Sequence, residues 1–208
     1  MSDTGPSITR GEKIVGVFTL AYVLAFTVWF LSIGNYEFIV YIATMAILGW
    51  LVVRNLRKAA FPLSILWALS IWGFAHMAGG GIPVGDSVLY SWVILPLIDV
   101  GDTIILKYDQ VVHFYGFGVT AWLLWHLLAR HFPDARGTST IYVYPALAAM
   151  GLGAVNEIIE FSAVLAVPET NVGGYYNTAL DLVFNGVGAV FAMWLVARRE
   201  RSRNNLKA

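Results

Sequence analysis

The stretch IVGVFTLAYVLAFTVWFLSI, residues 14–33, decides the class of fold, because it runs for 20 residues without a charged side chain. A helix needs about 20 apolar residues to cross the hydrocarbon core of a bilayer. A secretory signal has a shorter apolar core and a small-residue cleavage site, and no such site follows Ile33. We therefore expect a retained transmembrane helix, preceded by a flexible cytoplasmic tail over residues 1–9.

The composition of the whole chain agrees with a membrane protein. Of its 208 residues 58% are hydrophobic and 12% are charged, and the mean hydropathy is +0.69. A soluble domain is nearer half apolar and a quarter charged. The chain has no cysteine, which excludes disulfides, thiolate metal ligands and cysteine nucleophiles. No basic stretch is interleaved with aromatic residues, so we do not expect a nucleic-acid partner.

Further apolar segments predict an all-α fold, a polytopic membrane helix bundle with six transmembrane helices. Besides 14–33, the predicted spans are 37–53, 61–78, 109–128, 141–164 and 176–197. Repeats are absent, so we expect a single integral membrane domain over residues 1–208. Between the third and fourth spans lies the apolar run VLYSWVILPLI, residues 88–98, which is too short to cross and contains Pro96. We expect it to be a re-entrant or interfacial segment of the third loop.

The basic residues orient the spans, because lysine and arginine mark cytoplasmic loops. Every lysine and arginine except Lys107 lies at span ends that face one side in a six-span arrangement. Both termini, including a flexible tail over residues 199–208, are then cytoplasmic. The first, third and fifth loops face outward. The expected location is the bacterial inner membrane, with the lipid bilayer as the surrounding partner.

Ionisable side chains within the spans gather at the outward end. Such groups are costly in a membrane and by default mark functional sites. The six residues concerned are His76, Asp109, His113, Glu157, Glu160 and Asp181. Spacings of three or four residues place neighbours on one helix face, as for Asp109 with His113 and for Glu157 with Glu160. We therefore expect one polar site in the outer third of the bilayer.

The candidate roles follow from the side-chain chemistry. The predicted metal ligands are His76, Asp109, His113, Glu160 and Asp181. The predicted catalytic groups are Glu157, Glu160 and Asp181. The predicted supporting residues are Asn156, Asn177, Thr178 and Asn185. Structural alternatives remain open: Asp109 and Asn177 could cap helices, His76 could lie in headgroup water, and Asp181 with Asn185 could join helices by hydrogen bonds.

Small residues predict that the last three spans pack tightly, because small side chains let membrane helices approach closely. These residues are Gly116, Gly118, Ala149, Gly153, Gly186, Gly188 and Ala192.

Three motifs resemble a known family. They are DQVVHFY (109–115), NEIIEF (156–161) and DLVFNGVG (181–188), within a core of about residues 70–190. Together they resemble the YjdF-type predicted inner-membrane proteins and, more distantly, the VanZ-like membrane proteins. The resemblance implies a multi-helix bacterial membrane protein without established chemistry. Gln110 and Glu160 depart from the VanZ-like pattern, so a role in glycopeptide resistance is not transferred.

Three classes of function fit these residues. The imidazoles and carboxylates suit Zn²⁺, Mn²⁺ or Fe²⁺, and such a site could hydrolyse or transfer a lipid headgroup or a lipid-linked envelope precursor. No H-E-x-x-H motif supports this hypothesis. The second class is a proton-coupled transporter or small-ligand binder, although the chain lacks an inverted repeat. The third is a structural or partner-binding membrane protein. The oligomeric state stays open.

Overall fold

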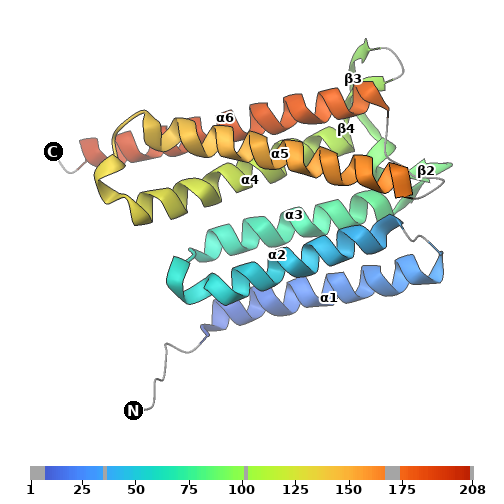
Figure 1. Cartoon of the computed structure of the whole chain (residues 1–208), viewed down its shortest axis with the longest axis horizontal. Helices are drawn as coiled ribbons and strands as arrows, with labels where there is room; N and C mark the ends of the chain where they lie inside the picture. Colours follow the sequence, from blue (N-terminus) through green and yellow to red (C-terminus); the bar gives the residue numbers. More distant parts are fainter. Residues whose placement is uncertain (1–7, 35–36, 101–102, 167–173, 207–208) are drawn as a thin grey trace. The chain divides into compact units, whose positions relative to one another are not determined.

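The computed structural model describes residues 8–34, 37–100, 103–166 and 174–206. Long helices dominate this part of the chain (Figure 1). They are α1 (Arg10–Ser32), α2 (Glu37–Ala59), α3 (Leu63–Gly81), α4 (Tyr108–His131), α5 (Thr140–Ala166) and α6 (Tyr175–Asn205). The shorter elements are the strands β1 (Pro83–Val84), β2 (Ser87–Val88), β3 (Val93–Val100) and β4 (Thr103–Lys107), and the 3₁₀ helices η1 (Leu89–Ser91) and η2 (Pro133–Ala135).

Five of the helices, α1, α3, α4, α5 and α6, are long and apolar enough to cross a membrane. The multi-pass helical fold is therefore confirmed. The predicted span 37–53 falls in α2, which is not among the five. The side chains of residues 37–41, at the start of α2, are not among those that the structure describes. That α2 is a sixth transmembrane helix therefore stays a prediction.

Contacts divide the chain into two compact units, residues 1–81 and residues 82–208. The single domain expected from the sequence therefore stays a prediction. In the first unit α1 packs against α2 and α3 (Figure 1). The hydroxyl oxygens of Thr19 and Ser70 lie 2.6 Å apart and join α1 to α3. At the start of α1, Glu12 accepts a hydrogen bond from the backbone N–H of Thr9 and pairs with Arg57 of α2.

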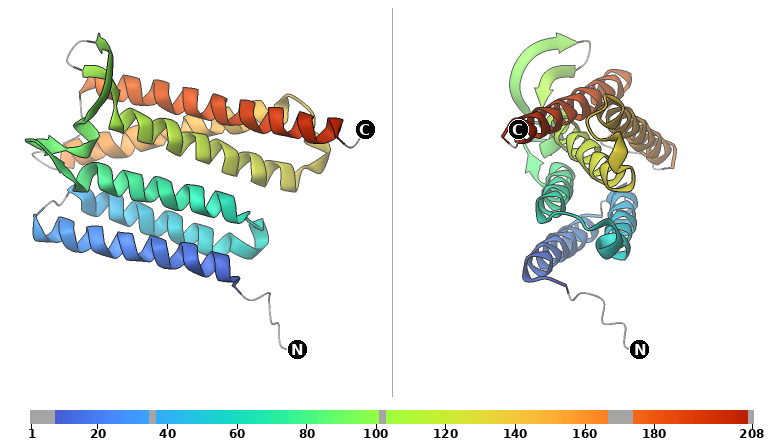
Figure 2. Two further views of the ribbon diagram at one scale, coloured as in Figure 1. Left: turned by 180° about the vertical axis from the view of Figure 1, so that it is seen from behind. Right: turned by 90° about the vertical axis from the view of Figure 1, so that its left-hand side faces the viewer.

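In the second unit α4, α5 and α6 lie side by side, and each packs against the other two (Figure 2). Small residues line the contacts, as predicted: a Cβ added at Gly118 would lie 3.1 Å from the carbonyl oxygen of Gly188. Buried alanines continue the core toward the other end, at Ala121, Ala149 and Ala189. The tight core expected of the last three spans is confirmed.

The third loop contains strands, which the all-α prediction missed. β1 pairs with β2, and β3 pairs antiparallel with β4 with a register shift between Val93 and Ile98. Pro96 lies at this irregularity, where its missing N–H interrupts the ladder least. The run 88–98, expected to be re-entrant or interfacial, thus folds as η1 and most of β3. Its depth in a membrane stays a prediction.

The C-terminal segment differs from the prediction. α6 remains helical through Asn205, although residues 199–208 were expected to form a tail. The guanidinium carbon of Arg198 lies 5.4 Å from the centre of the Trp194 ring, within the distance of a cation–π interaction. The hydroxyl of Ser202 donates to the Arg198 carbonyl at 3.1 Å. Polar side chains therefore continue the helix past the apolar span. Residues 1–7 and 207–208 lie outside the described residues.

Candidate functional site

The polar site begins where the β3–β4 hairpin passes into α4. The backbone N–H of Lys107 donates to Oε1 of Gln110 at 3.1 Å, and Nε2 of Gln110 reaches the Ile104 carbonyl at 3.5 Å. Gln110 has no exposed surface. This buried amide fixes the start of α4 and so the direction of Asp109. This role of Gln110 was not predicted, although the sequence carries a signal for it: a glutamine three residues after the N-cap Lys107, the spacing of a capping box.

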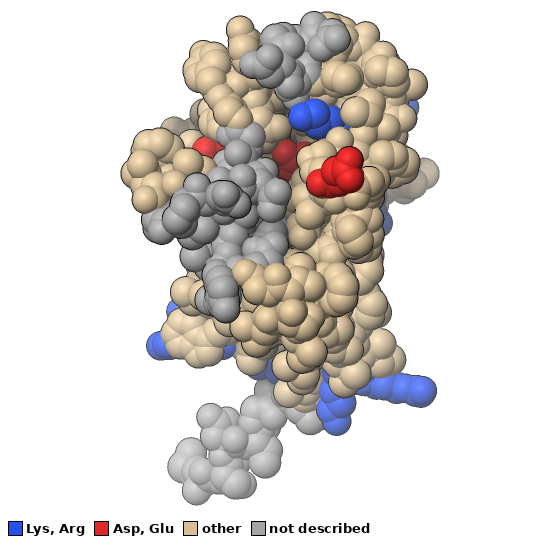
Figure 3. Space-filling view, turned by 90° about the vertical axis from the view of Figure 1, so that its right-hand side faces the viewer, with Lys and Arg blue, Asp and Glu red and all other residues tan. Residues whose placement is uncertain are grey.

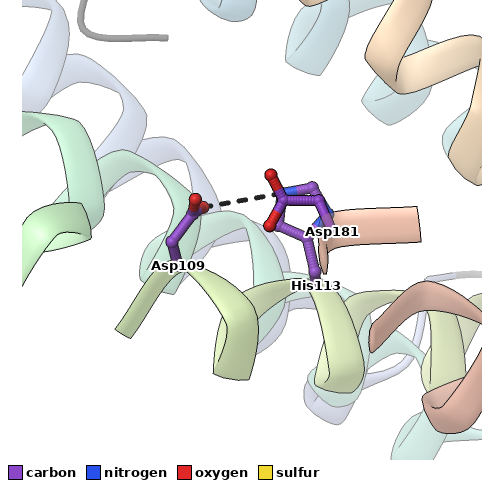
Figure 4. A group of neighbouring side chains, drawn as sticks. All are labelled: Asp109, His113 and Asp181. Atoms are coloured by element: carbon purple, nitrogen blue, oxygen red, sulfur yellow. Dashed lines mark ion pairs between the residues drawn. The ribbon is translucent and has the colours of Figure 1, made fainter. Parts of the chain in front are cut away.

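Asp109 and His113 lie one turn apart on α4. Nε2 of His113 is 3.5 Å from Oδ1 of Asp109. Asp181 projects from α6 toward the same pair, as Figure 4 shows. Only 6% of His113 and 1% of Asp181 are exposed. The two helices thus bring two carboxylates and one imidazole together, with His113 and Asp181 buried and the Asp109 side chain 16% exposed.

The other ring nitrogen of His113 faces α5 and the next turn of α6. Nδ1 lies 2.9 Å from Oδ1 of Asn185 and 3.8 Å from Oε1 of Glu157. When Nδ1 carries the proton, it donates to Asn185 and leaves a lone pair on Nε2. Asn185 is itself fully buried, and a Cβ added at Gly153 would lie 2.7 Å from its amide nitrogen. The glycine makes room for the amide that orients the imidazole.

Asn177 joins the two aspartates. Its Nδ2 donates to Oδ2 of Asp181 at 2.7 Å and to Oδ2 of Asp109 at 3.2 Å. One amide group therefore makes a hydrogen bond within α6, to Asp181, and a second one across to Asp109 in the first turn of α4. Because it is the donor to two carboxylates, Asn177 reduces the repulsion between them.

The two glutamates of α5 have different surroundings. Nδ2 of Asn156 donates to Oε1 of Glu160 at 2.7 Å. Glu157 is only 7% exposed, and neither of its carboxylate oxygens has a hydrogen-bond partner among the described residues. Oδ1 of Asp181 and the amide nitrogen of Asn185 are also buried, and neither has a hydrogen-bond partner among the described residues. Buried polar atoms are nearly always paired, so each of these atoms calls for an explanation.

The side chains form two groups that could hold a metal ion. One is Asp109, His113 and Asp181, and the other is His113, Glu157 and Glu160. Within each group the candidate ligand atoms lie within 4.8 Å of one another. His113 belongs to both groups. Imidazole nitrogen with carboxylate oxygen is the ligand set of Zn²⁺, Mn²⁺ and Fe²⁺ sites.

Two predicted site residues, His76 and Thr178, belong to neither group, and no hydrogen bond described above joins them to one. His76 lies in α3 and belongs to the other unit, so its role as a ligand stays a prediction. Thr178 lies in the first turn of α6, where its backbone N–H donates to the Gly174 carbonyl at 3.2 Å. The supporting role of its side chain also stays a prediction.

Residues 14–202 match the sequence model of a family described as Predicted membrane protein (DUF2238). The chain belongs to this family. The match includes all the site residues named above. The resemblance to the YjdF-type proteins is confirmed, since these are the DUF2238 family. Nothing shows the more distant relation to the VanZ-like proteins. Comparisons with curated proteins and with solved structures gave no match.

Proposed function

We propose that this DUF2238 protein binds a divalent cation, Zn²⁺, Mn²⁺ or Fe²⁺, through Asp109, His113 and Asp181. The observation that carries the proposal is the buried, unpartnered oxygen of Asp181, in a group whose candidate ligand atoms, among them a ring nitrogen of His113, lie within 4.8 Å of one another. In the described part of the chain no lysine or arginine forms an ion pair with these carboxylates. A cation offsets the mutual repulsion of converging carboxylates and their loss of hydration.

The surroundings of His113 support the assignment of Nε2 as the ligand atom. Metal-ligating histidines usually donate their other N–H to an oxygen that fixes the ring. Here Oδ1 of Asn185 accepts that hydrogen bond at 2.9 Å. Three protein ligands leave a coordination position for water or substrate, the pattern of catalytic rather than structural metal sites. A cation held there would polarise a substrate oxygen or activate a water molecule.

We propose that the substrate is a lipid headgroup or a lipid-linked envelope precursor. The carboxylates of Glu157 and Asp181 lie within about 15 Å along their helices of the ends at Ala166 and Tyr175, at 1.5 Å per residue. The β3–β4 hairpin is at the same end of the second unit (Figure 2). Viewed from that end, the surface carries few charged side chains (Figure 3). This depth matches that of lipid headgroups and the chain just below them. When this cation alone is bound, Glu157 and Glu160 would be the groups that transfer protons beside it.

A direct test is metal analysis of the full chain, purified in detergent with a tag that contains no histidine. We expect the wild type to retain Zn²⁺ or Mn²⁺ after dialysis and His113→Ala to retain less than about a tenth, because the loss of one ligand from a three-ligand site removes most of the affinity. His131→Ala is the matched control, since His131 lies exposed on the same helix. Equal metal content in wild type and His113→Ala would refute the proposal.

The orientation proposed for the membrane has six spans, with both termini cytoplasmic and the third loop outside. The distribution of lysine and arginine supports it. Because the chain has no cysteine, single cysteines can be introduced at the exposed Ser87 and Ser139. An impermeant thiol reagent applied to intact cells should label Ser87→Cys strongly and Ser139→Cys at background level. After lysis both should react. The reverse labelling pattern would place the polar site at the cytoplasmic face.

A second candidate function is proton-coupled transport of a small molecule. The observation in its favour is Glu157, whose buried and unpartnered carboxylate could take up and release a proton. Metal analysis separates the two candidates. If the wild type retains no divalent cation but takes up protons, and the Glu157→Gln variant does not take them up, the protein would be a proton carrier.

A further inference from the structure

A second cluster lies beside the proposed cation site, on the other side of the His113 ring. It consists of Glu157, Glu160 and Nδ1 of His113. Glu157 is 7% exposed, and both of its oxygens lack a partner, while Oε1 points to within 3.8 Å of Nδ1. The cation at Asp109 and Asp181 would not satisfy these oxygens, because the two groups share only the imidazole.

Charge balance also calls for more than one cation. Four carboxylates from three helices meet around His113: Asp109, Glu157, Glu160 and Asp181. One divalent cation neutralises two of them. Among the described residues the amide of Asn156 donates to Glu160 and that of Asn177 to Asp109 and Asp181, while Glu157 has no donor. Uncompensated charges in a low-dielectric interior cost several kcal/mol each, by order of magnitude.

We propose that the site holds a second divalent cation, bound by Glu157, Glu160 and Nδ1 of His113, so that the imidazole bridges two metal ions. This inference rests on the proposed function, since the first cation occupies the Nε2 side. The two nitrogens of one imidazole point in different directions, and each offers a lone pair once the second cation displaces the Nδ1 proton, which is released to the solvent. Asn185 then loses its hydrogen bond from Nδ1, and its oxygen becomes available as a further ligand of the second cation.

The experiment titrates the full chain in detergent with Mn²⁺ and records its electron paramagnetic resonance spectrum. We expect about two equivalents in the wild type, with spectral coupling between the ions that appears only as the second equivalent binds. The double variant Glu157→Gln with Glu160→Gln should bind about one equivalent, without coupling. Asp134→Asn is the matched control, because Asp134 is exposed in η2, and it should behave as the wild type.

Each result decides one proposal. A wild type that binds one equivalent, with the glutamine variant unchanged, overturns the second cation and leaves the proposed function standing. Two equivalents without coupling, or two retained by the glutamine variant, place the second ion elsewhere and also overturn the bridge. A wild type that binds none overturns both proposals. If the glutamine variant does not fold, the stoichiometry and coupling of the wild type decide alone.

Discussion

Replacement of Gly188 by leucine is expected to prevent α4, α5 and α6 from assembling, and replacement by alanine to destabilise them by about 1–3 kcal/mol. A Cβ at this position would meet the carbonyl oxygen of Phe114 on α4 and would lie 2.8 Å from its carbonyl carbon and 2.9 Å from its Cα. These are backbone atoms, which cannot rotate away as a side chain can. The two helices must therefore move apart, and the move also separates Asp109 and His113 from Asp181.

The matched control is Gly151, which lies in α5 with nothing within 4 Å of an added Cβ. Both glycines lie inside long helices, so the gain in helix propensity from alanine is similar and cancels in the comparison. Thermal unfolding in detergent, followed by fluorescence-detected size exclusion, measures the effect. We expect Gly151→Ala to match or exceed the wild type. If Gly188→Leu unfolds at the temperature of the wild type, the close α4–α6 contact does not exist.

The second large effect is expected for Asn177→Asp in the protein stripped of metal. The change keeps the shape of the side chain but replaces the donor to Asp109 and Asp181 with a third carboxylate. Removal of a donor between two charged acceptors, together with an added like charge, costs on the order of a few kcal/mol. We expect a fall of several degrees in the unfolding temperature in the presence of chelator. Divalent cation should restore a large part of the loss, because it supplies the positive charge that the amide donor had provided.

Asn55→Asp is the control, since among the described residues the hydrogen bond of the Asn55 side chain is to the Leu51 carbonyl, one turn earlier in α2. It should unfold close to the wild type with and without cation. An unchanged unfolding temperature for Asn177→Asp in chelator would show that the amide does not bridge the aspartates. A loss that no divalent cation relieves would support the hydrogen bonds but count against the metal proposal.

Local pattern explains why the helices were predicted well and the third loop was not. A helix satisfies its backbone hydrogen bonds within one segment, so length and apolar character are enough to predict α1 and α4. The β3–β4 ladder depends on pairing between Val93–Val100 and Thr103–Lys107, and the apolar run 88–98 does not by itself indicate a partner. The same holds for Gln110, whose buried role depends on the hairpin that precedes α4.

By itself the sequence determined the membrane class, most of the helix bounds and the five ionisable residues on α4, α5 and α6 that the structure brings together, because hydropathy, charge and helical spacing are local properties. The place of His76 stays a prediction. Only the tertiary structure decided how those residues divide: Asn185 and Glu157 lie on the Nδ1 side of His113, Asp109 lies on the Nε2 side, and Asp181 is joined to Asp109 through Asn177. The physical reason is the close packing of α4 against α6 at Gly188, which sets the rotation of one helix against the other. That rotation decides which side chains meet, and no spacing along a single helix contains it.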